Sequence, residues 1–305
     1  MTTAQGATLS AAHEISGPEG APVILALGGI SAGRHVVRNH LDSTPGWWEC
    51  VAGPGNVLDT EHRRVMSVDF LDGGSADDGR PEQIVTTFDQ AAHIVELLDE
   101  LGIDQLDALV GASYGGMVAL VLAEHWPARV RRLVVISAAH ESHPMATGLR
   151  AIQRRVVELG LETGRACDGM TLARAIAMTT YRTAQEFTER FDAVAVHAGG
   201  AVEFDVERYL MTSGARFAER MTPARFLALS LSADLHHVVP EHITVPTTVI
   251  AAQGDTLVPP SLLRALARRL PHLVGYHLIR TRFGHDAFLT EPARLGFLLS
   301  SALAD

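Results

Sequence analysis

The stretch LVGASYGGMVALVLAEHWP, residues 109–127, constrains the fold more than any other part of the sequence. It places Ser113 in a G-x-S-x-G pattern, just after one apolar run and just before another. A short apolar run that ends in glycines is typical of a buried strand, and the run that follows it has the length of a helix. The pattern therefore predicts a sharp strand-to-helix turn. On its own, that turn fits either a reactive serine or a small polar residue in a tight corner.

The other apolar segments alternate between predicted strands and predicted helices. Strands are expected at residues 22–29, 63–70, 106–113, 130–138, 247–255 and 274–280. Helices are expected at residues 84–103, 115–127, 260–270 and 292–303. Such alternation predicts an α/β fold, in which helices cover both faces of a mostly parallel central sheet.

The alternation stops in the middle of the chain, where the pattern from residue 141 to residue 239 is mainly helical. We therefore expect an α/β core made of residues 1–140 and 240–305, interrupted by a helical lid at 141–239. Ligands bind at the carboxyl ends of the strands in open sheets of this kind. The lid is expected to cover that edge.

Composition and charge argue against several classes of protein. The formal net charge of −10 is unsuited to bulk nucleic-acid binding, which needs a basic face. Residues 1–20 lack the charged and apolar regions of a signal peptide, and the apolar run at 21–30 is too short to span a bilayer. Cys50 and Cys167 cannot form a disulfide framework. We expect a cytoplasmic protein whose partners include neither a nucleic acid nor a membrane.

Ser113 is a weak nucleophile unless a base takes its proton and an acid orients that base. Candidates for both follow in the order serine, aspartate, histidine. Asp255 ends the predicted strand 247–255, and His285 lies in a glycine-led loop after the predicted strand 274–280. Each residue alone has a structural explanation. The ordered set, with each member placed after a strand, predicts a catalytic triad.

Acyl transfer also needs two backbone N–H groups that face the developing oxyanion. The first is expected from Tyr114, directly after the serine. The second is expected from the loop after the first strand, where Ile30 is our candidate. Gly28 and Gly29 in that loop could instead serve only to turn the chain.

Histidines near the end of the insertion raise the question of a metal site. His236 and His237 are adjacent, and Glu241 and His242 follow shortly after. Adjacent residues rarely face one ion, and this spacing fits no tetrahedral ligand set. We expect no metal.

Several blocks of the sequence resemble the homoserine O-acyltransferase family of the α/β-hydrolase superfamily. Outside the insertion they are GWWECVAGPGNVLDT at 46–60, GASYGGMVAL at 111–120, GDTLVPP at 254–260 and GHDAFL at 284–289. Inside it they are AIAMTTYRTAQEFTERF, FDVERYLMTSGARFAER and SADLHH. These blocks are spread over most of the chain, and a generic hydrolase has no reason to carry all of them.

The resemblance implies a ping-pong transfer of an acyl group from acyl-CoA to the hydroxyl of L-homoserine, in methionine biosynthesis, through an ester on Ser113. It implies no bound cofactor, and a homodimer formed through the helical insertion. It also implies that Arg182 binds the acceptor carboxylate and that Asp234 binds its ammonium group. Without a ligand-binding role, Arg182 would be an ordinary surface arginine and Asp234 an aspartate at a helix end. Asp286, next to His285, is a further substrate-binding candidate.

Three departures from the family pattern lie near the expected acyl pocket. The family's nucleophile block usually reads G-G-S-M-G, so that Tyr114 replaces a methionine. The loop GGISAGRH, residues 28–35, differs from the usual H-A-L-T-G form, and Phe226 stands where tyrosine is common. These changes leave the donor open between acetyl- and succinyl-CoA, although the loop and Tyr114 favour succinyl. Arg34, in the same loop, could pair with the distal carboxylate of a succinyl group.

The sequence leaves other assignments open. Arg150, Arg154 and Arg155 cluster in one predicted helix, where they could attract anionic CoA or form a solvated face. The acceptor could be L-serine, which is one methylene shorter than homoserine. The same triad could serve an esterase or a thioesterase. The fold could also form a non-catalytic binding protein, against which an ordered triad weighs.

Overall fold

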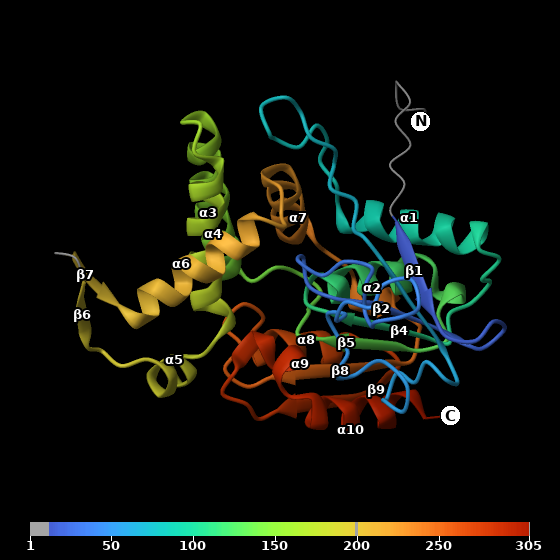
Figure 1. Cartoon of the computed structure of the whole chain (residues 1–305). Helices are drawn as coiled ribbons and strands as arrows, with labels where there is room; N and C mark the ends of the chain where they lie inside the picture. The colour runs from blue at the N-terminus through green and yellow to red at the C-terminus, as the bar shows by residue number, and fades with distance from the viewer. Residues whose placement is uncertain (1–11, 199–200, 305) are drawn as a thin grey trace.

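A seven-stranded sheet forms the centre of the protein, seen here in a computed structural model that describes residues 12–198 and 201–304 (Figure 1). The strand order is β1-β3-β2-β4-β5-β8-β9. The bounds are β1 His13–Ser16, β2 Val23–Leu27, β3 Arg64–Val68, β4 Ala108–Ala112, β5 Leu133–Ile136, β8 Thr247–Ala252 and β9 Leu273–Ile279. The edge strand β1 pairs antiparallel with β3, while the other neighbours pair in parallel. The mostly parallel sheet is confirmed, and β1 was not predicted because its four residues carry too short a pattern.

Helices cover both faces of the sheet, as predicted. Successive residues of a strand point to opposite faces. In β2, Leu25 and Leu27 belong to the apolar cluster that also holds residues of α1, α2 and α8. Ile24 and Ala26 belong to the cluster on the opposite face, which holds residues of α10. The bounds of these helices are α1 Thr87–Glu100, α2 Tyr114–His125, α8 Pro260–Arg269 and α10 Pro292–Leu303.

Helix α1 begins later than the apolar pattern indicates. The pattern predicts a helix from residue 84, but α1 starts at Thr87. The Thr86 side chain accepts a hydrogen bond from the backbone N–H of Asp89, and the Asp89 carboxylate accepts one from the N–H of Thr86. This capping box satisfies two N–H groups that would otherwise lack partners. Ile84 therefore stays outside the helix and is 68% exposed.

In the described residues, five α-helices and a hairpin lie between β5 and β8. Their bounds are α3 Pro144–Glu162, α4 Ala166–Tyr181, α5 Ala184–Arg190, β6 Ala195–Ala198, β7 Ala201–Phe204, α6 Asp205–Ala218 and α7 Pro223–Leu235. Helices α3, α4, α6 and α7 form their own small apolar core, which includes Met170, Phe217 and Phe226. Figure 1 shows α3, α4 and α6 standing beside one end of the sheet.

A short hairpin, which the sequence pattern did not indicate, lies within this mainly helical region. The pattern predicts a helix up to residue 194, but α5 ends at Arg190, and β6 pairs antiparallel with β7 from Ala195 opposite Phe204. The run AVAV at 193–196 alternates alanine with the β-branched residue valine, which favours a strand over a helix. In Figure 1 the hairpin reaches out from α5 and α6, away from the sheet.

Two neighbouring connections join the insertion to the sheet. The backbone N–H of Val238, after α7, donates to the carbonyl of His140, after β5, at 2.9 Å. The imidazole of His236 donates from Nε2 to the carbonyl of Ala139 at 3.0 Å and accepts at Nδ1 from the Thr87 hydroxyl at 3.1 Å. Burial lowers the pKa of His236 to about 3. The ring therefore stays neutral, and its two hydrogen bonds persist at physiological pH.

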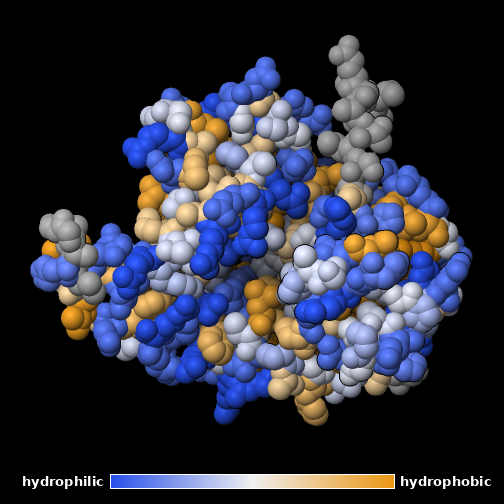
Figure 2. Space-filling model, viewed as in Figure 1, coloured by the Kyte–Doolittle hydropathy of each residue, from blue (hydrophilic) through white to orange (hydrophobic). Residues whose placement is uncertain are grey.

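The surface of the protein is largely hydrophilic on the face shown in Figure 2, where apolar residues are scattered among polar ones. Among the helices that the structure describes, none has the length and apolarity needed to cross a bilayer. The prediction that the chain begins without a signal peptide rests on residues 1–20, of which 1–11 lie outside the described part.

Candidate active site

Ser113 occupies a strained turn between β4 and α2. Its φ is +55°, a region that residues with a side chain rarely adopt. The chain keeps this turn because the backbone around it is close-packed. A methyl group at Gly115 would lie 2.4 Å from the carbonyl oxygen of Leu27, and one at Gly111 would lie 2.5 Å from the carbonyl oxygen of Gly115. The glycines of the G-x-S-x-G pattern are thus required by the packing of the corner that lifts Ser113 above the sheet.

Three side chains from separate loops meet at this corner. The Ser113 Oγ lies 2.8 Å from His285 Nε2, and His285 Nδ1 lies 2.7 Å from Asp255 Oδ2. The Asp255 Oδ1 accepts hydrogen bonds from the backbone N–H groups of Leu257 and Val258, which fix the carboxylate. A carboxylate only accepts, so the proton of a neutral imidazole sits on Nδ1, and Nε2 accepts from the serine hydroxyl. This is the arrangement that the serine, aspartate and histidine order predicts.

The pKa of the His285 imidazole is held above its ordinary value of 6.5. Burial of the ring acts in the opposite direction, because it disfavours the charged form. The negative charge and hydrogen bond of Asp255, together with the charge of Asp286, outweigh that burial and the nearby Arg150. The imidazolium that forms when His285 takes a proton is therefore stabilised in place.

The two predicted oxyanion donors lie beside the serine. The loop after β2 is held against the turn by a hydrogen bond from the N–H of Gly115 to the carbonyl of Gly28, at 2.8 Å. A methyl group built on Gly29 would lie 4.0 Å from the Ser113 Oγ. Tyr114 and Ile30 both line the cavity at Ser113, and within the described chain their backbone N–H groups have no hydrogen-bond partner. Both N–H groups are thus available to a negatively charged oxygen.

A cavity of about 350 Å³ opens above Ser113 and His285. The α/β core supplies one wall, with the loop from Gly29 to Ala32 and the indole of Trp47. The insertion supplies the opposite wall, whose polar members are Arg150, Gln153, Arg174, Thr180, Tyr181, Arg182 and Ser230. Ser113 is therefore enclosed between the core and the inserted helices.

The Tyr114 side chain connects the serine turn to the insertion. It is buried, and its hydroxyl lies 2.7 Å from the Oγ of Ser232 in α7. Its ring packs edge-on against Phe70, with 4.8 Å between the ring centroids. Burial raises the pKa of the tyrosine, so the hydroxyl stays protonated. This substitution in the nucleophile block thus has a structural consequence, because the residue after Ser113 is anchored to α7.

Arg182 and Asp286 form a pair at the cavity wall. The Arg182 Nε donates to the Asp286 Oδ2 at 2.6 Å, and its Nη1 donates to Glu186 at 3.3 Å. These bonds use two of the five N–H groups of the guanidinium. Both Arg182 and Asp286 line the cavity, next to His285. The structure therefore brings together a cation and an anion, the two groups that a zwitterionic amino acid requires.

Asp234 does not lie in the cavity wall, although it was predicted to bind an ammonium group there. It accepts hydrogen bonds from Arg150 at 2.8 Å and from Arg154 at 2.6 Å, and its side chain is 7% exposed. Two guanidinium groups thus occupy the carboxylate. Asp234 instead holds Arg150, which does line the cavity. Arg155 points elsewhere and pairs with Glu158 and Glu162, so the three predicted arginines do not form one patch.

Arg34 is not brought to the cavity either. Its guanidinium pairs with Asp69, and its backbone N–H donates to the same carboxylate at 2.8 Å. Its side chain is 46% exposed, and it is absent from the residues that line the cavity. The backbone bond fixes the direction of the loop, so Arg34 faces outward while Ile30 faces the serine.

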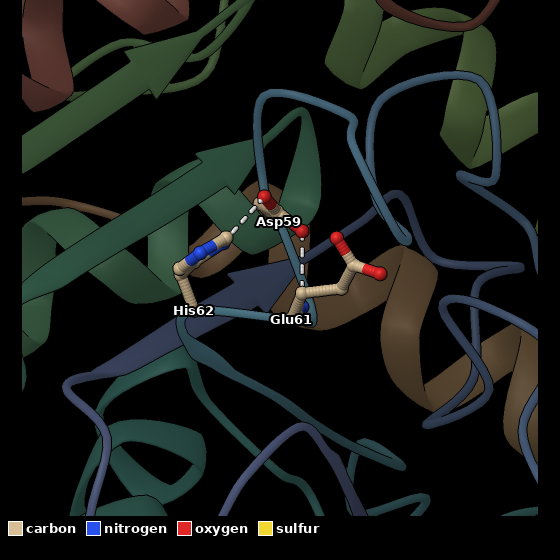
Figure 3. A group of neighbouring side chains, drawn as sticks. All are labelled: Asp59, Glu61 and His62. Carbon is tan, nitrogen blue, oxygen red and sulfur yellow. Dashed lines mark hydrogen bonds and ion pairs between the residues drawn. The ribbon is translucent and has the colours of Figure 1, made fainter.

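The histidines near the end of the insertion lie in separate surroundings. His236 binds Thr87 and Ala139, whereas Glu241 pairs with Arg269 on the surface. In the described residues, one group of side chains has atoms close enough to share an ion, namely Asp59, Glu61 and His62. Figure 3 shows the hydrogen bonds that Asp59 makes to the His62 ring and to the Glu61 backbone. These three side chains are therefore close together because Asp59 forms hydrogen bonds within a surface turn.

Known proteins of similar sequence identify the family. A profile of the alpha/beta hydrolase fold matches residues 22–292. Homoserine O-succinyltransferase of Xanthomonas campestris pv. campestris is 42% identical over 291 residues, which cover 95% of this chain and 78% of that protein. The chain belongs to the homoserine O-acyltransferase family. Serine O-succinyltransferase of Litchfieldella anticariensis is 30% identical, over 94% of this chain and 89% of that protein.

A solved homoserine O-acyltransferase shares the fold. Homoserine O-acetyltransferase from Bacillus anthracis superimposes with a TM-score of 0.85 at 19% identity, over 96% of this chain and 91% of that one. At this identity the likeness concerns the fold. It agrees with the predicted α/β-hydrolase architecture.

Three residues that line the cavity of this homoserine O-acyltransferase were not predicted from the sequence as site residues. Gln153 lies on the buried stripe of α3 with Ala146 and Val157, and a glutamine on such a stripe was the available signal. Arg174 lies between two alanines in the mainly apolar run TLARAIAM. A charged residue in such a run was the available signal for Arg174. Trp47 belongs to a block noticed only through the resemblance.

Proposed function

We propose that this protein transfers an acyl group from acyl-CoA to the hydroxyl of L-homoserine, with succinyl favoured over acetyl, through an ester on Ser113. The main support is one observation. The hydrogen-bonded set Ser113, His285 and Asp255 opens into a cavity whose wall carries the paired Arg182 and Asp286. The relatives named above, which act on homoserine or serine, support the same class of reaction.

The first half-reaction forms the acyl-enzyme. His285 Nε2 takes the hydroxyl proton of Ser113 as Oγ attacks the thioester carbon. The carbonyl oxygen becomes an oxyanion, which the N–H groups of Tyr114 and Ile30 stabilise. When the carbon–sulfur bond breaks, His285 returns the proton to the sulfur, and free CoA leaves with its thiol. Asp255 holds the Nδ1 proton of the imidazole and stabilises its positive charge throughout.

The second half-reaction uses the same groups in reverse. The homoserine hydroxyl gives its proton to His285 Nε2 and attacks the ester carbon. The bond to Ser113 Oγ then breaks, and the serine regains its proton from His285. The three unused N–H groups of Arg182 suit the acceptor carboxylate, and the second oxygen of Asp286 suits its ammonium group. Held in this way, the hydroxyl reaches the ester ahead of water.

The insertion serves as a lid in this proposal. The cavity has walls from both the core and the inserted helices, so solvent has limited access to the ester. An esterase or thioesterase would use the same triad with water as acceptor, and a binding protein would form no ester. The Arg182–Asp286 pair favours an amino-acid acceptor over these alternatives.

A matrix of donors and acceptors tests the proposal. Acetyl-CoA and succinyl-CoA are each incubated with the protein and with homoserine, with serine or with no acceptor, and the ester is detected by mass. We expect an O-acyl ester of homoserine and thiol release that depends on the acceptor. Thiol release at the same rate without an acceptor, and without an ester product, would make the protein a thioesterase.

Replacing Arg182 separates acceptor binding from acylation. We expect Arg182→Met to raise the KM for homoserine about 100-fold, because the amino-acid carboxylate loses a charged partner. The burst of thiol release that accompanies acylation should change by less than about threefold. Arg190→Met is the matched control, since Arg190 pairs with the same Glu186 but is absent from the cavity wall. An unchanged KM for homoserine in Arg182→Met contradicts the assignment.

We further propose that the insertion forms a homodimer interface. The exposed apolar residues that support this lie on α3, α4 and the hairpin, and they are Ile152, Leu159, Leu172, Val202 and Phe204. Their burial against a second copy would remove apolar surface from water. Sedimentation at micromolar concentration should give the mass of two chains, and a single-chain mass would contradict the proposal.

A further inference from the structure

The cavity carries more positive charge than an amino-acid acceptor needs. Arg182 meets two carboxylates, Asp286 and Glu186. Arg150 and Arg154 share one, Asp234. A zwitterionic acceptor brings one negative and one positive group, which the Arg182–Asp286 pair matches. Any further guanidinium in the wall lacks a counter-charge from that acceptor.

Arg174, on α4, is such a guanidinium. It lines the cavity, and within the described residues no carboxylate lies within ion-pairing distance of it. Its guanidinium carbon lies 4.7 Å from the centre of the Phe217 ring and 5.1 Å from that of Tyr181. A guanidinium stacked on aromatic rings keeps the N–H groups of its edge free, and that edge binds carboxylates in a bidentate manner.

The position of Arg174 relates it to the reacting atoms. The Tyr181 ring that it covers also lies against the His285 imidazole, with 6.0 Å between ring centroids and 30° between planes. Arg174 and the base thus contact one tyrosine. Arg174 and Ser113 also line the same cavity, so a group bound to Arg174 lies in the space that opens onto the serine.

Gln153 provides a second, independent observation. It is 4% exposed and lines the cavity from α3, the helix that packs on α4. No group among the described residues makes a hydrogen bond to its side-chain amide, which borders the cavity. Buried polar groups of folded proteins are normally paired, so an amide that faces a cavity in this way is suited to a ligand.

We propose that Arg174 and Gln153 bind the distal carboxylate of a dicarboxylic acyl group, and so select succinyl over acetyl donors. This rests on the acyltransferase function proposed above. The guanidinium edge of Arg174 takes the two carboxylate oxygens, and the Gln153 amide donates to one of them. The role given to Arg34 by the sequence thus passes to a residue of the insertion.

The test compares donors within one variant. Acylation of Ser113 is followed by intact-protein mass and thiol release with no acceptor present, using succinyl-CoA and acetyl-CoA. We expect Arg174→Met to lower kcat/KM for succinyl-CoA about 100-fold, because one partner of an enclosed charge pair is removed. With acetyl-CoA the change should stay below about threefold, since acetyl carries no carboxylate. Gln153→Leu should lower the succinyl rate about tenfold, the usual effect of a lost hydrogen bond to a charge.

Controls separate this role from structural effects and from CoA binding. The control is Arg165→Met, because Arg165 is exposed just before α4 and pairs with Asp168 in the first turn of that helix. This variant should use both donors as well as the parent does. Equal losses for both donors in Arg174→Met would overturn the proposal. Such losses would mean that Arg174 acts on CoA binding or on the stability of the fold, on which acylation by either donor depends. A parent that forms homoserine ester from acetyl-CoA but not from succinyl-CoA would also overturn it. If the parent forms no ester from either donor, the proposed function itself fails.

Discussion

Ser113→Ala is expected to lower kcat for acyl transfer by at least about 10⁴-fold, since the residual rate of a triad enzyme without its nucleophile comes only from binding and the oxyanion donors. The hydroxyl contacts His285 Nε2 at 2.8 Å and sits on a turn that the packed glycines fix. Parent protein incubated with acyl-CoA alone should gain the mass of one acyl group on the peptide that contains Ser113. The variant should gain none.

Ser137 offers a matched control for that experiment. It also follows a strand, β5, has a φ of +47° and is buried. Within the described chain its hydroxyl has no hydrogen-bond partner. Ser137→Ala should therefore retain the activity of the parent and its acylation. If Ser113→Ala still forms ester at the parent rate, every covalent mechanism through this residue is wrong.

Asp255→Asn should produce the second large effect. We expect kcat to fall about 10⁴-fold, which is the loss seen in serine-triad enzymes when the aspartate is replaced by asparagine. The amide can donate to Nδ1 and so favours the tautomer whose Nε2 carries the proton and cannot accept from Ser113. The fold should tolerate the change, because one oxygen remains to accept from Leu257 and Val258. Activity and the melting temperature are measured together. Asp69→Asn, at the partner of Arg34 outside the cavity, is the control.

The pH dependence of Asp255→Asn tests the electrostatic part of this account. His285 must be neutral to act as a base, so kcat/KM in the parent should fall as the pH drops through a pKa above 6.5. Burial lowers this pKa and Asp255 raises it, so removing the carboxylate charge should move the acid limb to lower pH. An acid limb that stays in place would mean that another group controls it.

The core of the fold and the triad could be predicted because their signals are local. Short apolar runs gave the parallel strands, and the glycines around Ser113 gave the turn. Asp255 and His285 each follow a strand, and the carboxyl ends of parallel strands share one edge, so sequence order alone placed them near Ser113.

The cavity wall that the insertion supplies could not be predicted from local patterns, because it depends on how the inserted helices pack against one another. Asp234 has the same sequence context whether it faces a ligand or two arginines, and only the packing of α3 on α7 decides this. Arg34 was directed outward by a bond from its own backbone to Asp69, 35 residues away. The hairpin β6–β7 was missed because its strands are four residues long.

The two connections between the core and the insertion lie side by side, joined by the hydrogen bond between Val238 and His140. A chain that leaves and re-enters a domain at neighbouring points can exchange the intervening segment while the rest of the domain keeps its structure. Ser113, Asp255 and His285 all lie outside that segment, whereas Arg150, Gln153, Arg174 and Arg182 lie inside it. Evolution can therefore change one wall of the cavity by replacing a single continuous segment, while Ser113, His285 and Asp286 stay in the core.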